Sequence, residues 1–393
     1  MKSLLSASAM LALLAGAAHA EVKIGVLLGF TGPLESVAGP IASGAEMALS
    51  EASDSGKLLG GETVTPVRGD STCVDASAAT AAGERLVTAE GVAGIVGAMC
   101  SGATGAVLAN VAIPNGVVMI SPSATSPGLS TVEDNGLFFR TAPSDARQSV
   151  VMADIIKEHG LTEVAVTYTN NDYGKGLADS FQSAFEAAGG TVTIVAPHDD
   201  GKGDYSAEVG ALASAGGEAL VVAGYVDEGG SGIIQSALDT GAFDTFVLPD
   251  GMVAPSLTEK FGSDIDGSFG QLPGSDSEGG ATFDSLAEAA GFDGSQVYAK
   301  EGYDAAALIM LAMQAAGSAD ASAYKEKVME VANAPGEKIY PGELAKGLEI
   351  LAGGGDIDYV GASDVELIGP GEASGRFREV TIEGGEIVTV GYR

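Results

Sequence analysis

Short β-branched segments alternate with helical patterns over the first third of the chain. Residues 22–28 are rich in Val, Ile and Leu, and residues 40–55 then place Ile41, Ala45 and Leu49 at helical spacing. The order repeats up to residue 121, with strands expected at 63–68, 92–97 and 117–121 and helices at 75–88 and 102–112. Strands separated by helices of this length predict a parallel sheet covered on both faces.

A second run of the same kind begins at residue 145. Helices are expected at 145–158, 173–188, 205–215 and 232–239, and strands at 163–169, 191–196, 219–225 and 245–248. A Gly/Ser-rich stretch at 273–280 then leads to helices at 282–290, 296–316 and 321–333 and to a strand-rich tail. We therefore predict an α/β fold with two Rossmann-like lobes, each a parallel sheet flanked by helices.

The late helices are expected to complete the first lobe, so that the chain crosses between the lobes more than once, through a multi-strand hinge. We assign residues 21–143 and 272–373 to the N-terminal lobe, and residues 144–271 and 374–393 to the C-terminal lobe. Ligands of open parallel sheets bind beyond the carboxyl ends of the strands. The loops after each strand are thus the places to search for a site.

The first twenty residues have the pattern of a secretory signal peptide. Lys2 precedes an apolar stretch over residues 4–18, and Ala18-His19-Ala20 fits a small-x-small cleavage site. A membrane helix is the alternative, but the apolar stretch is shorter than the roughly 20 residues that a bilayer demands. No cysteine follows the cleavage point to carry a lipid anchor. We expect a freely diffusing periplasmic protein.

The net charge and the number of cysteines narrow the possible functions and binding partners of the protein. The net charge of −34 is spread along the chain, which predicts an acidic surface that repels nucleic acid and anionic lipid. Cys73 and Cys100 are the only cysteines, and an even count in an oxidising compartment favours one disulfide. Two thiols without nearby histidine do not make a structural zinc site. No metal is predicted, and we also predict no cofactor.

Two loops of the first lobe are rich in small and hydroxyl residues. Residues 97–105 contain Met99 and Ser101, and residues 120–125 end in Thr125. Neighbouring parallel strands bring both loops to one edge of the sheet, where hydroxyls and free backbone amides suit a small anionic group such as a carboxylate. A capping serine and close packing would give a similar pattern in the first loop. A Walker loop and a dinucleotide-binding glycine pattern are both absent.

The second lobe offers tyrosines and acids at its strand ends. Tyr173, Tyr225 and Asp250 follow successive strands, and a tyrosine with an acid suits a ligand that has an apolar body and an ammonium group. An enclosed ammonium needs an opposing charge, which the first-lobe loops do not supply. We favour Asp250 for this charge over its competitors Asp172 and Asp227. Taken alone, Asp250 is also a common turn residue.

Catalysis is the first alternative to binding. The predicted mature chain has only His159 and His198, and neither lies near a serine in a nucleophile-elbow pattern. We therefore predict no catalytic residues and no enzyme. A sensory module of the same fold is the second alternative, because both uses require hinge closure.

The ordered set of motifs resembles one family. Its members here are Phe30-Thr31-Gly32-Pro33, Cys73, the loop around Cys100 and Ser101, Ser121-Pro122-Ser123-Ala124-Thr125, Arg140-Thr141, Asp172-Tyr173-Gly174 and Gly224-Tyr225. Together they resemble the periplasmic branched-chain amino acid binding proteins, over nearly the whole predicted mature chain. The resemblance implies the class I periplasmic binding protein fold and a disulfide between Cys73 and Cys100.

The resemblance also implies a role for each site residue. Ser101 and Thr125 would hold the ligand's α-carboxylate. The Ser123 carbonyl and the Thr125 hydroxyl would meet its ammonium, and Asp250 would supply the balancing charge. Tyr173 and Tyr225 would close over the ligand. The predicted ligand-binding set is completed by Met99, Ala124 and Asp145.

Two positions depart from the family pattern. Relatives commonly have an aromatic residue where this chain has Val37 and a glutamate where it has Asp250, so the resemblance implies that the side-chain pocket is enlarged or the ligand shifted.

The partners that the resemblance implies are an amino-acid-like ligand, branched-chain or related, and the membrane permease subunits of an ABC transporter. Another small carboxylate or an amide is the alternative ligand. We expect a monomer and no nucleic acid partner.

Overall fold

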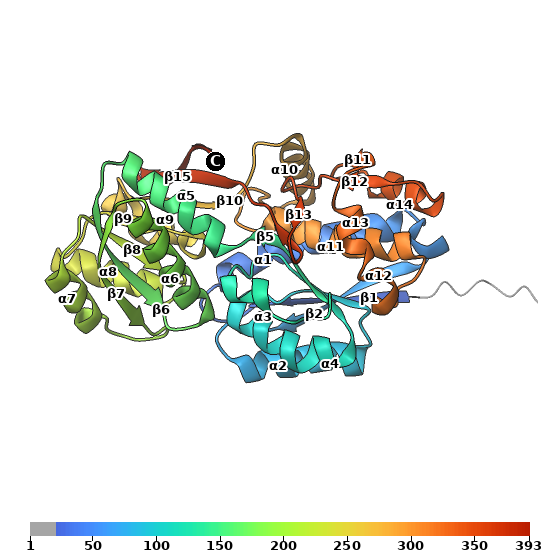
Figure 1. Ribbon diagram of the computed structural model, residues 1–393, viewed down its shortest axis with the longest axis horizontal. Coiled ribbons are helices and arrows are strands. Elements are labelled where there is room, and N and C mark those ends of the chain that lie inside the picture. The colour runs from blue at the N-terminus through green and yellow to red at the C-terminus, as the bar shows by residue number, and fades with distance from the viewer. Residues whose placement is uncertain (1–20) are drawn as a thin grey trace, which may run out of the picture.

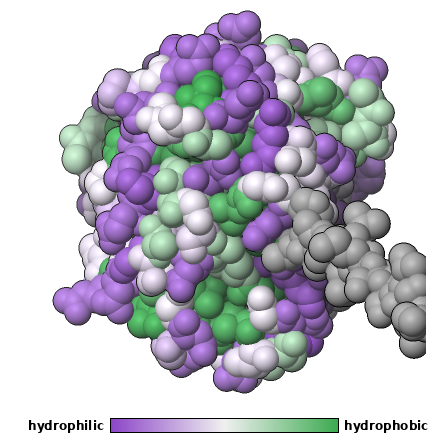
Figure 2. All heavy atoms as spheres, turned by 90° about the vertical axis from the view of Figure 1, so that its right-hand side faces the viewer, coloured by the Kyte–Doolittle hydropathy of each residue, from purple (hydrophilic) through white to green (hydrophobic). Residues whose placement is uncertain are grey.

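The computed structural model describes residues 21–393, and the predicted signal peptide at 1–20 lies outside these described residues. Two seven-stranded sheets form two lobes that lie side by side, each with helices packed around its sheet (Figure 1). The predicted fold class is confirmed. Figure 2 shows hydrophilic and apolar groups intermixed on the face at the far end of the first lobe.

The first sheet has the strand order β13-β14-β5-β4-β3-β1-β2, and its five N-terminal strands pair in parallel. The strands are β1 (Glu21–Leu28), β2 (Thr63–Asp70), β3 (Gly94–Gly97), β4 (Val118–Ser121), β5 (Phe138–Pro143), β13 (Leu367–Ile368) and β14 (Glu372–Ala373). The helices that the chain forms between these strands include α1 (Glu35–Asp54), α2 (Ala76–Glu84), α3 (Ser101–Val107) and α4 (Ile113–Asn115). Strands β3 and β4 are buried along their whole length, which explains their mostly apolar sequences.

The second sheet repeats this architecture with the order β16-β15-β10-β9-β8-β6-β7. Its parallel strands are β6 (Glu163–Thr169), β7 (Thr191–His198), β8 (Ala219–Ala223), β9 (Phe246–Leu248) and β10 (Phe269–Pro273), and the antiparallel pair β15 (Phe377–Glu383) and β16 (Glu386–Tyr392) extends one edge. The helices of this part are α5 (Asp145–Glu158), α6 (Asp172–Ala187), α7 (Ser206–Ala215), α8 (Gly229–Thr240) and α9 (Pro255–Phe261).

The segment after β10 returns to the first lobe, as Figure 1 shows for its orange and red elements. It contains α10 (Glu278–Ala290), α11 (Ala299–Ala316), α12 (Ala321–Tyr324), α13 (Lys327–Val331), α14 (Leu344–Ala352), β11 (Glu337–Ile339) and β12 (Ile357–Tyr359). Helix α11 is almost entirely buried and packs on α1. Gly44 and Gly302 permit this close approach, because a Cβ at Gly44 would lie 2.2 Å from the Ala299 carbonyl oxygen.

The strand pairings show three passages of the chain between the two sheets, after β5, after β10 and after β14. The lobe boundaries themselves stay a prediction. Most predicted elements agree with the structure within a few residues, and α5 and β6 agree at both ends. Strands β5 and β10 were not predicted, because each has a long polar side chain, Arg140 or Gln271, within a short apolar segment that ends in proline.

One predicted helix is wrong. The helix expected at 321–333 is two short helices, α12 and α13, with a turn at residues 325–326. The Tyr324 hydroxyl donates to the Ala93 carbonyl oxygen at 2.9 Å, and the Lys325 ammonium donates to the Asn135 carbonyl oxygen at 2.6 Å. These tertiary contacts override the local helical pattern at the break.

Glu301 is a buried acid in the first turn of α11, and its pKa predicts a pH-dependent stability. Burial, reinforced by the negative charge of Asp304, raises the pKa of Glu301 from 4.5 to about 7. The folded state therefore holds a proton that the unfolded state releases, so stability falls as pH rises from about 4.5 to about 7. We expect Glu301→Gln to raise the free energy of unfolding by about 2 kcal/mol at pH 8 and by little near pH 4.

Urea unfolding of both proteins across this pH range checks the Glu301 prediction. Glu278→Gln is the matched control, because Glu278 also lies in the first turn of a helix, α10, but is exposed. The control is expected to show no such pH-dependent difference. An equal effect of Glu301→Gln at pH 4 and pH 8 would contradict the proposed proton uptake.

Candidate functional site

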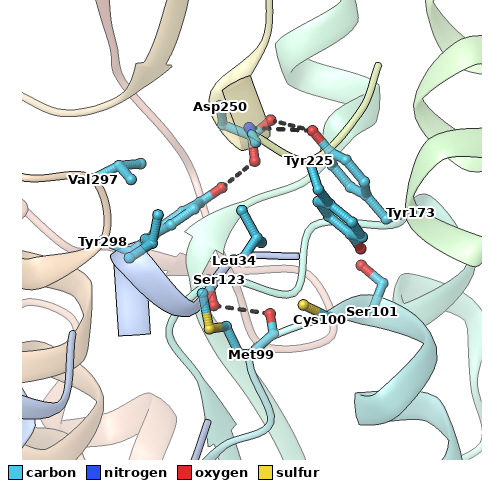
Figure 3. A pocket seen from close by; sticks show the side chains of 12 residues that line it. Leu34, Met99, Cys100, Ser101, Ser123, Tyr173, Tyr225, Asp250, Val297 and Tyr298 are labelled. Atoms are coloured by element: carbon cyan, nitrogen blue, oxygen red, sulfur yellow. Dashed lines mark hydrogen bonds between the residues drawn. The ribbon is translucent and has the colours of Figure 1, made fainter. Parts of the chain in front are cut away.

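A cavity lies between the two lobes, at the carboxyl ends of both parallel sheets (Figure 3). The space between atoms in this region is about 350 Å³, which includes some open solvent. Predicted site residues make up over half of its wall, namely Met99, Ser101, Ser123, Tyr173, Tyr225 and Asp250, together with the disulfide residue Cys100. The remaining wall consists of Leu34, Val37, Gly251, Val297 and Tyr298.

The two hydroxyl-rich loops of the first lobe are bonded to each other. The Ser123 hydroxyl donates to the Met99 carbonyl oxygen at 2.9 Å, and the Ser121 hydroxyl donates to the Ala98 carbonyl oxygen at 2.6 Å. The Ser126 amide donates to the Ser101 hydroxyl oxygen at 3.1 Å. Ser101 thus accepts from the protein and keeps its own hydroxyl proton for another acceptor. The loops after β3 and β4 form one prearranged polar surface.

Arg140 holds this surface in place from behind. Its guanidinium is buried, donates to the carbonyl oxygens of Ala124 at 3.1 Å and Ser126 at 3.0 Å, and pairs with Glu372 of β14 at 2.5 Å. The motif Arg140-Thr141 was recognised only through the family resemblance. In the structure, Arg140 supports the loop after β4. Of the predicted ligand-binding residues, Ala124, Thr125 and Asp145 are buried but are not among those that line the cavity.

The disulfide between Cys73 and Cys100 is confirmed, with Cα atoms 5.1 Å apart. It ties the loop after β2 to the loop after β3, directly beside the cavity. Gly29 allows the bridge to sit there, because a Cβ at Gly29 would lie 2.7 Å from the Cys73 sulfur. The bridge therefore fixes the position of Cys100 and of the Ser101 backbone next to it.

Asp250 is the acid that faces the cavity from the second lobe. It is 4% exposed and accepts three side-chain hydrogen bonds, from Gln148 at 2.8 Å, Tyr173 at 3.1 Å and Tyr298 at 2.5 Å (Figure 3). Burial raises the pKa of the Asp250 carboxyl group, and the three donors partly offset this effect. Such a group is poised to be stabilised by a cation in the cavity.

Two tyrosines complete the second-lobe wall. The rings of Tyr173 and Tyr225 are stacked, with centroids 5.2 Å apart and planes 9° from parallel. Tyr173 stands at the start of α6, where Asn171 caps the helix by accepting from the Gly174 amide. Both side chains are buried and present flat surfaces to the cavity.

Asp145 forms a second buried acid near Asp250. It begins α5, and its amide donates to the Thr125 carbonyl oxygen at 2.9 Å. Burial and the negative charge of Asp250 raise the pKa of Asp145 well above its ordinary value. In the described part of the chain, the Asp145 carboxylate oxygens, the Thr125 hydroxyl and the Gln148 amide oxygen have no hydrogen-bond partner. Buried acceptors of this kind favour a ligand rich in donors.

The two competitors of Asp250 lie elsewhere. Asp172 is exposed at the start of α6, and neither it nor Asp227 lines the cavity. The Asp227 carboxylate instead accepts hydrogen bonds from Ser36 and Ser256 at the rim of the cleft. The sequence argument did not distinguish Asp227 from Asp250 by position, and the structure places only Asp250 in the cavity wall.

Sequence reasoning missed the residues that reach the cavity from outside the strand-end loops. Tyr298 was expected inside a helix that begins near residue 296, but α11 begins at Ala299 and Tyr298 precedes it with φ of 64°. Leu34 and Val37 come from the start of α1, where the helix begins earlier than predicted. Val37 had been named as a position that alters the side-chain pocket, but not in the predicted ligand-binding set. The unusual backbone of Tyr298 leaves no mark in hydrophobic periodicity, so the pattern offered no signal.

Comparisons with known proteins agree with this geometry. The profile of a family described as periplasmic binding protein matches residues 21–338. The Leu/Ile/Val-binding protein homolog 1 of Brucella melitensis is 31% identical over 338 residues, covering 83% of this chain and 88% of the relative. The leucine-, isoleucine-, valine-, threonine- and alanine-binding protein of Pseudomonas aeruginosa is 28% identical, covering 80% of this chain and 82% of the relative.

Solved structures show the same fold. The crystal structure of a leucine binding protein from Thermotoga maritima superimposes with a TM-score of 0.79 at 23% identity, covering 94% of this chain and 98% of the other. The predicted resemblance to the branched-chain amino acid binding proteins is confirmed by these matches. The chain belongs to the periplasmic binding protein family.

Proposed function

We propose that this protein encloses a free α-amino acid between its lobes and presents it to the permease of an ABC importer. The observation that carries the proposal is Asp250, a buried acid with three donors around it that faces a hydroxyl-rich surface across the cavity. An amino acid has an ammonium for the acid and a carboxylate for the hydroxyls. The names of the relatives from Brucella and Pseudomonas support the same ligand class.

The proposed contacts divide the ligand between the lobes. Ser101 and Thr125 hold the carboxylate, while the Ser123 carbonyl, the Thr125 hydroxyl and Asp250 meet the ammonium. Asp145 is proposed to offer a further acceptor oxygen near this site, because its carboxyl oxygens have no hydrogen-bond partner among the described residues. Tyr173 and Tyr225 cover the ligand. These roles match the donors and acceptors at each position.

The ligand's side chain is proposed to contact the apolar wall formed by Leu34, Val37 and Val297, with Met99 beside them. No basic residue is among the residues that line the cavity, so an acidic side chain would lack a partner. The aliphatic wall favours an apolar side chain over a polar one.

The cellular setting is part of the proposal. We infer export by the signal peptide at residues 1–20, release into the periplasm, and action as a monomer. Among residues 21–393, no helix is both long enough and apolar enough to traverse a bilayer. The family to which the chain belongs consists of binding proteins, and we propose no catalytic role for the cavity.

A thermal-shift screen of amino acids tests the proposed function. Ligand at about 100 times Kd stabilises the folded state by about 2.7 kcal/mol, so a true ligand is expected to raise the melting temperature by several degrees. The panel contains leucine, isoleucine, valine, threonine and alanine. Matched controls are N-acetyl-leucine, which lacks the ammonium, and leucinamide, which lacks the carboxylate.

The controls separate the proposed ligand class from its alternative. Both analogues are expected to give no shift, because each leaves one charged half of the site without a partner. A shift with N-acetyl-leucine as large as with leucine would favour a binder of small carboxylates. Absence of any shift across the amino acids would contradict the proposed function.

A further inference from the structure

A cluster of hydrogen bonds joins the two lobes at the rim of the cleft, outside the ligand cavity. The Asp227 carboxylate, from the loop after β8, accepts from the Ser36 amide at 3.0 Å and from the Ser36 hydroxyl at 2.9 Å. The Asp227 amide donates to the Pro33 carbonyl oxygen at 3.2 Å. Ser256 of α9 also donates to the Asp227 carboxylate at 2.9 Å. We call these four residues the rim latch.

The rim latch completes a helix that its own lobe leaves uncapped. Helix α1 has Leu34 at its N-cap and no side-chain cap, although it is 20 residues long. Asp227 supplies the missing acceptor to the Ser36 amide in the first turn, from the other lobe. A carboxylate at this end of a helix is also favoured by the helix dipole. The two lobes therefore share one helix cap, which exists only while they are closed together.

The rim latch is separate from the ligand. None of Pro33, Ser36, Asp227 and Ser256 lines the ligand cavity, although Tyr225, two residues before Asp227, does. The latch residues Ser36 and Asp227 instead border an outer groove on the cleft rim. The Tyr298 bond to Asp250 also joins the segment before α11 to the second lobe, but it lies inside the cavity, where a ligand contacts both groups.

Other charges at the rim oppose closure. Glu35 belongs to α1 and Glu228 to the second lobe, and both border the same outer groove as Asp227. The pKa of Glu228 is raised by burial, with further contributions from the negative charges of Asp200, Asp227 and Glu35. Closing the cleft thus brings acids of both lobes together, and the shared cap is the contact that offsets their repulsion.

We propose that Asp227 is a positioning residue that sets the closed population of the cleft, and hence the affinity for every ligand, without contacting any of them. A group that stabilises only the closed state multiplies all affinities by the same factor. The proposal rests on the proposed function only in that amino-acid affinity is used to report closure.

Calorimetry on Asp227→Ala over the amino-acid panel tests the rim latch. We expect every Kd to rise by about tenfold, with the ratios between amino acids unchanged, since several charge-assisted bonds are lost. Asp227→Asn keeps one acceptor oxygen and is expected to lose less. Glu228→Ala is the matched control, because it removes the same charge from the next residue; it relieves repulsion at the rim and is expected to leave Kd unchanged or to lower it, in contrast to Asp227→Ala.

Two results would overturn the latch. Unchanged affinities in Asp227→Ala would show that the contact contributes nothing to closure, and altered ratios between amino acids would show that Asp227 acts on the ligand itself. Hydrogen exchange at the Ser36 amide gives a readout that does not require an identified ligand. The wild type is expected to exchange this amide more slowly than Asp227→Ala.

The exchange measurement separates the two proposals. If the wild type binds none of the amino acids, the proposed function fails, and the exchange rate of Ser36 still judges the latch. Equal exchange rates in the wild type and in Asp227→Ala, with and without a bound amino acid, would contradict the latch even if the proposed function holds.

Discussion

Replacing Asp250 with alanine is expected to weaken amino-acid binding by about thirtyfold to several thousandfold. The ligand's ammonium loses its water inside the closed cavity, and without Asp250 it would lack its nearest opposing charge. Removing one partner of a buried, hydrogen-bonded charge pair typically costs about 2 to 5 kcal/mol. Calorimetry with the best amino acid of the panel measures the loss, and circular dichroism checks that the variant is folded.

Two further variants sharpen the Asp250 test. Asp250→Asn keeps the size of the side chain but removes its charge, so it is expected to lose nearly as much affinity as the alanine variant. Asp172→Ala is the matched control, because Asp172 is exposed beside Tyr173 and does not line the cavity. A loss below about tenfold in Asp250→Ala, beside a much larger loss in Asp227→Ala, would place the ammonium near Asp227.

Removing the disulfide is expected to lower the free energy of unfolding by about 3.5 kcal/mol. The bridge joins Cys73 to Cys100 over a sequence separation of 27 residues, and a loop of this length gives that value in the chain-entropy model. Urea unfolding of the double variant Cys73→Ser/Cys100→Ser measures the change. Amino-acid affinity should fall as well, because the bridge positions Cys100 beside Ser101 in the cavity wall.

Reduced wild-type protein is the control for the disulfide variant, since it lacks the bridge but keeps both sulfur atoms. It is expected to lose a similar amount of stability. Thiol titration of denatured, unreduced protein should find no reactive group. Two reactive thiols, or a double variant as stable as the wild type, would contradict the stabilising role of the bridge.

Most of the fold could be predicted from the sequence, because most strands and helices have a recognisable local pattern of apolar and polar residues. Buried parallel strands such as β3 and β8 are short and apolar throughout. Amphipathic helices such as α5 have a capping residue at the start and apolar residues at helical spacing. Where tertiary contacts compete with local preference, prediction failed. The break between α12 and α13 follows contacts of Tyr324 and Lys325 with distant backbone oxygens.

Some residues of the candidate site could also be predicted from the sequence, whereas others could not. The strand-end rule placed Ser101, Tyr173, Tyr225 and Asp250 at the sheet edges where the cavity lies, because the loops that follow parallel strands gather at one edge. It could not locate Tyr298, which bonds to Asp250 from the residue just before α11, 48 residues later in the chain. Nothing in the local pattern states which distant segment will close a cavity.

Asp227 and Asp250 show most directly what sequence and tertiary structure each decide. The sequence alone places both acids after strands of the second lobe, and it sets the α/β architecture, the cysteine pair and the motifs of the family. Only the packing of the lobes assigns Asp250 to the cavity and Asp227 to the N-terminus of α1. The reason is physical: periodicity records which face of an element is buried, whereas the partner of a polar side chain depends on how two separately folded sheets meet.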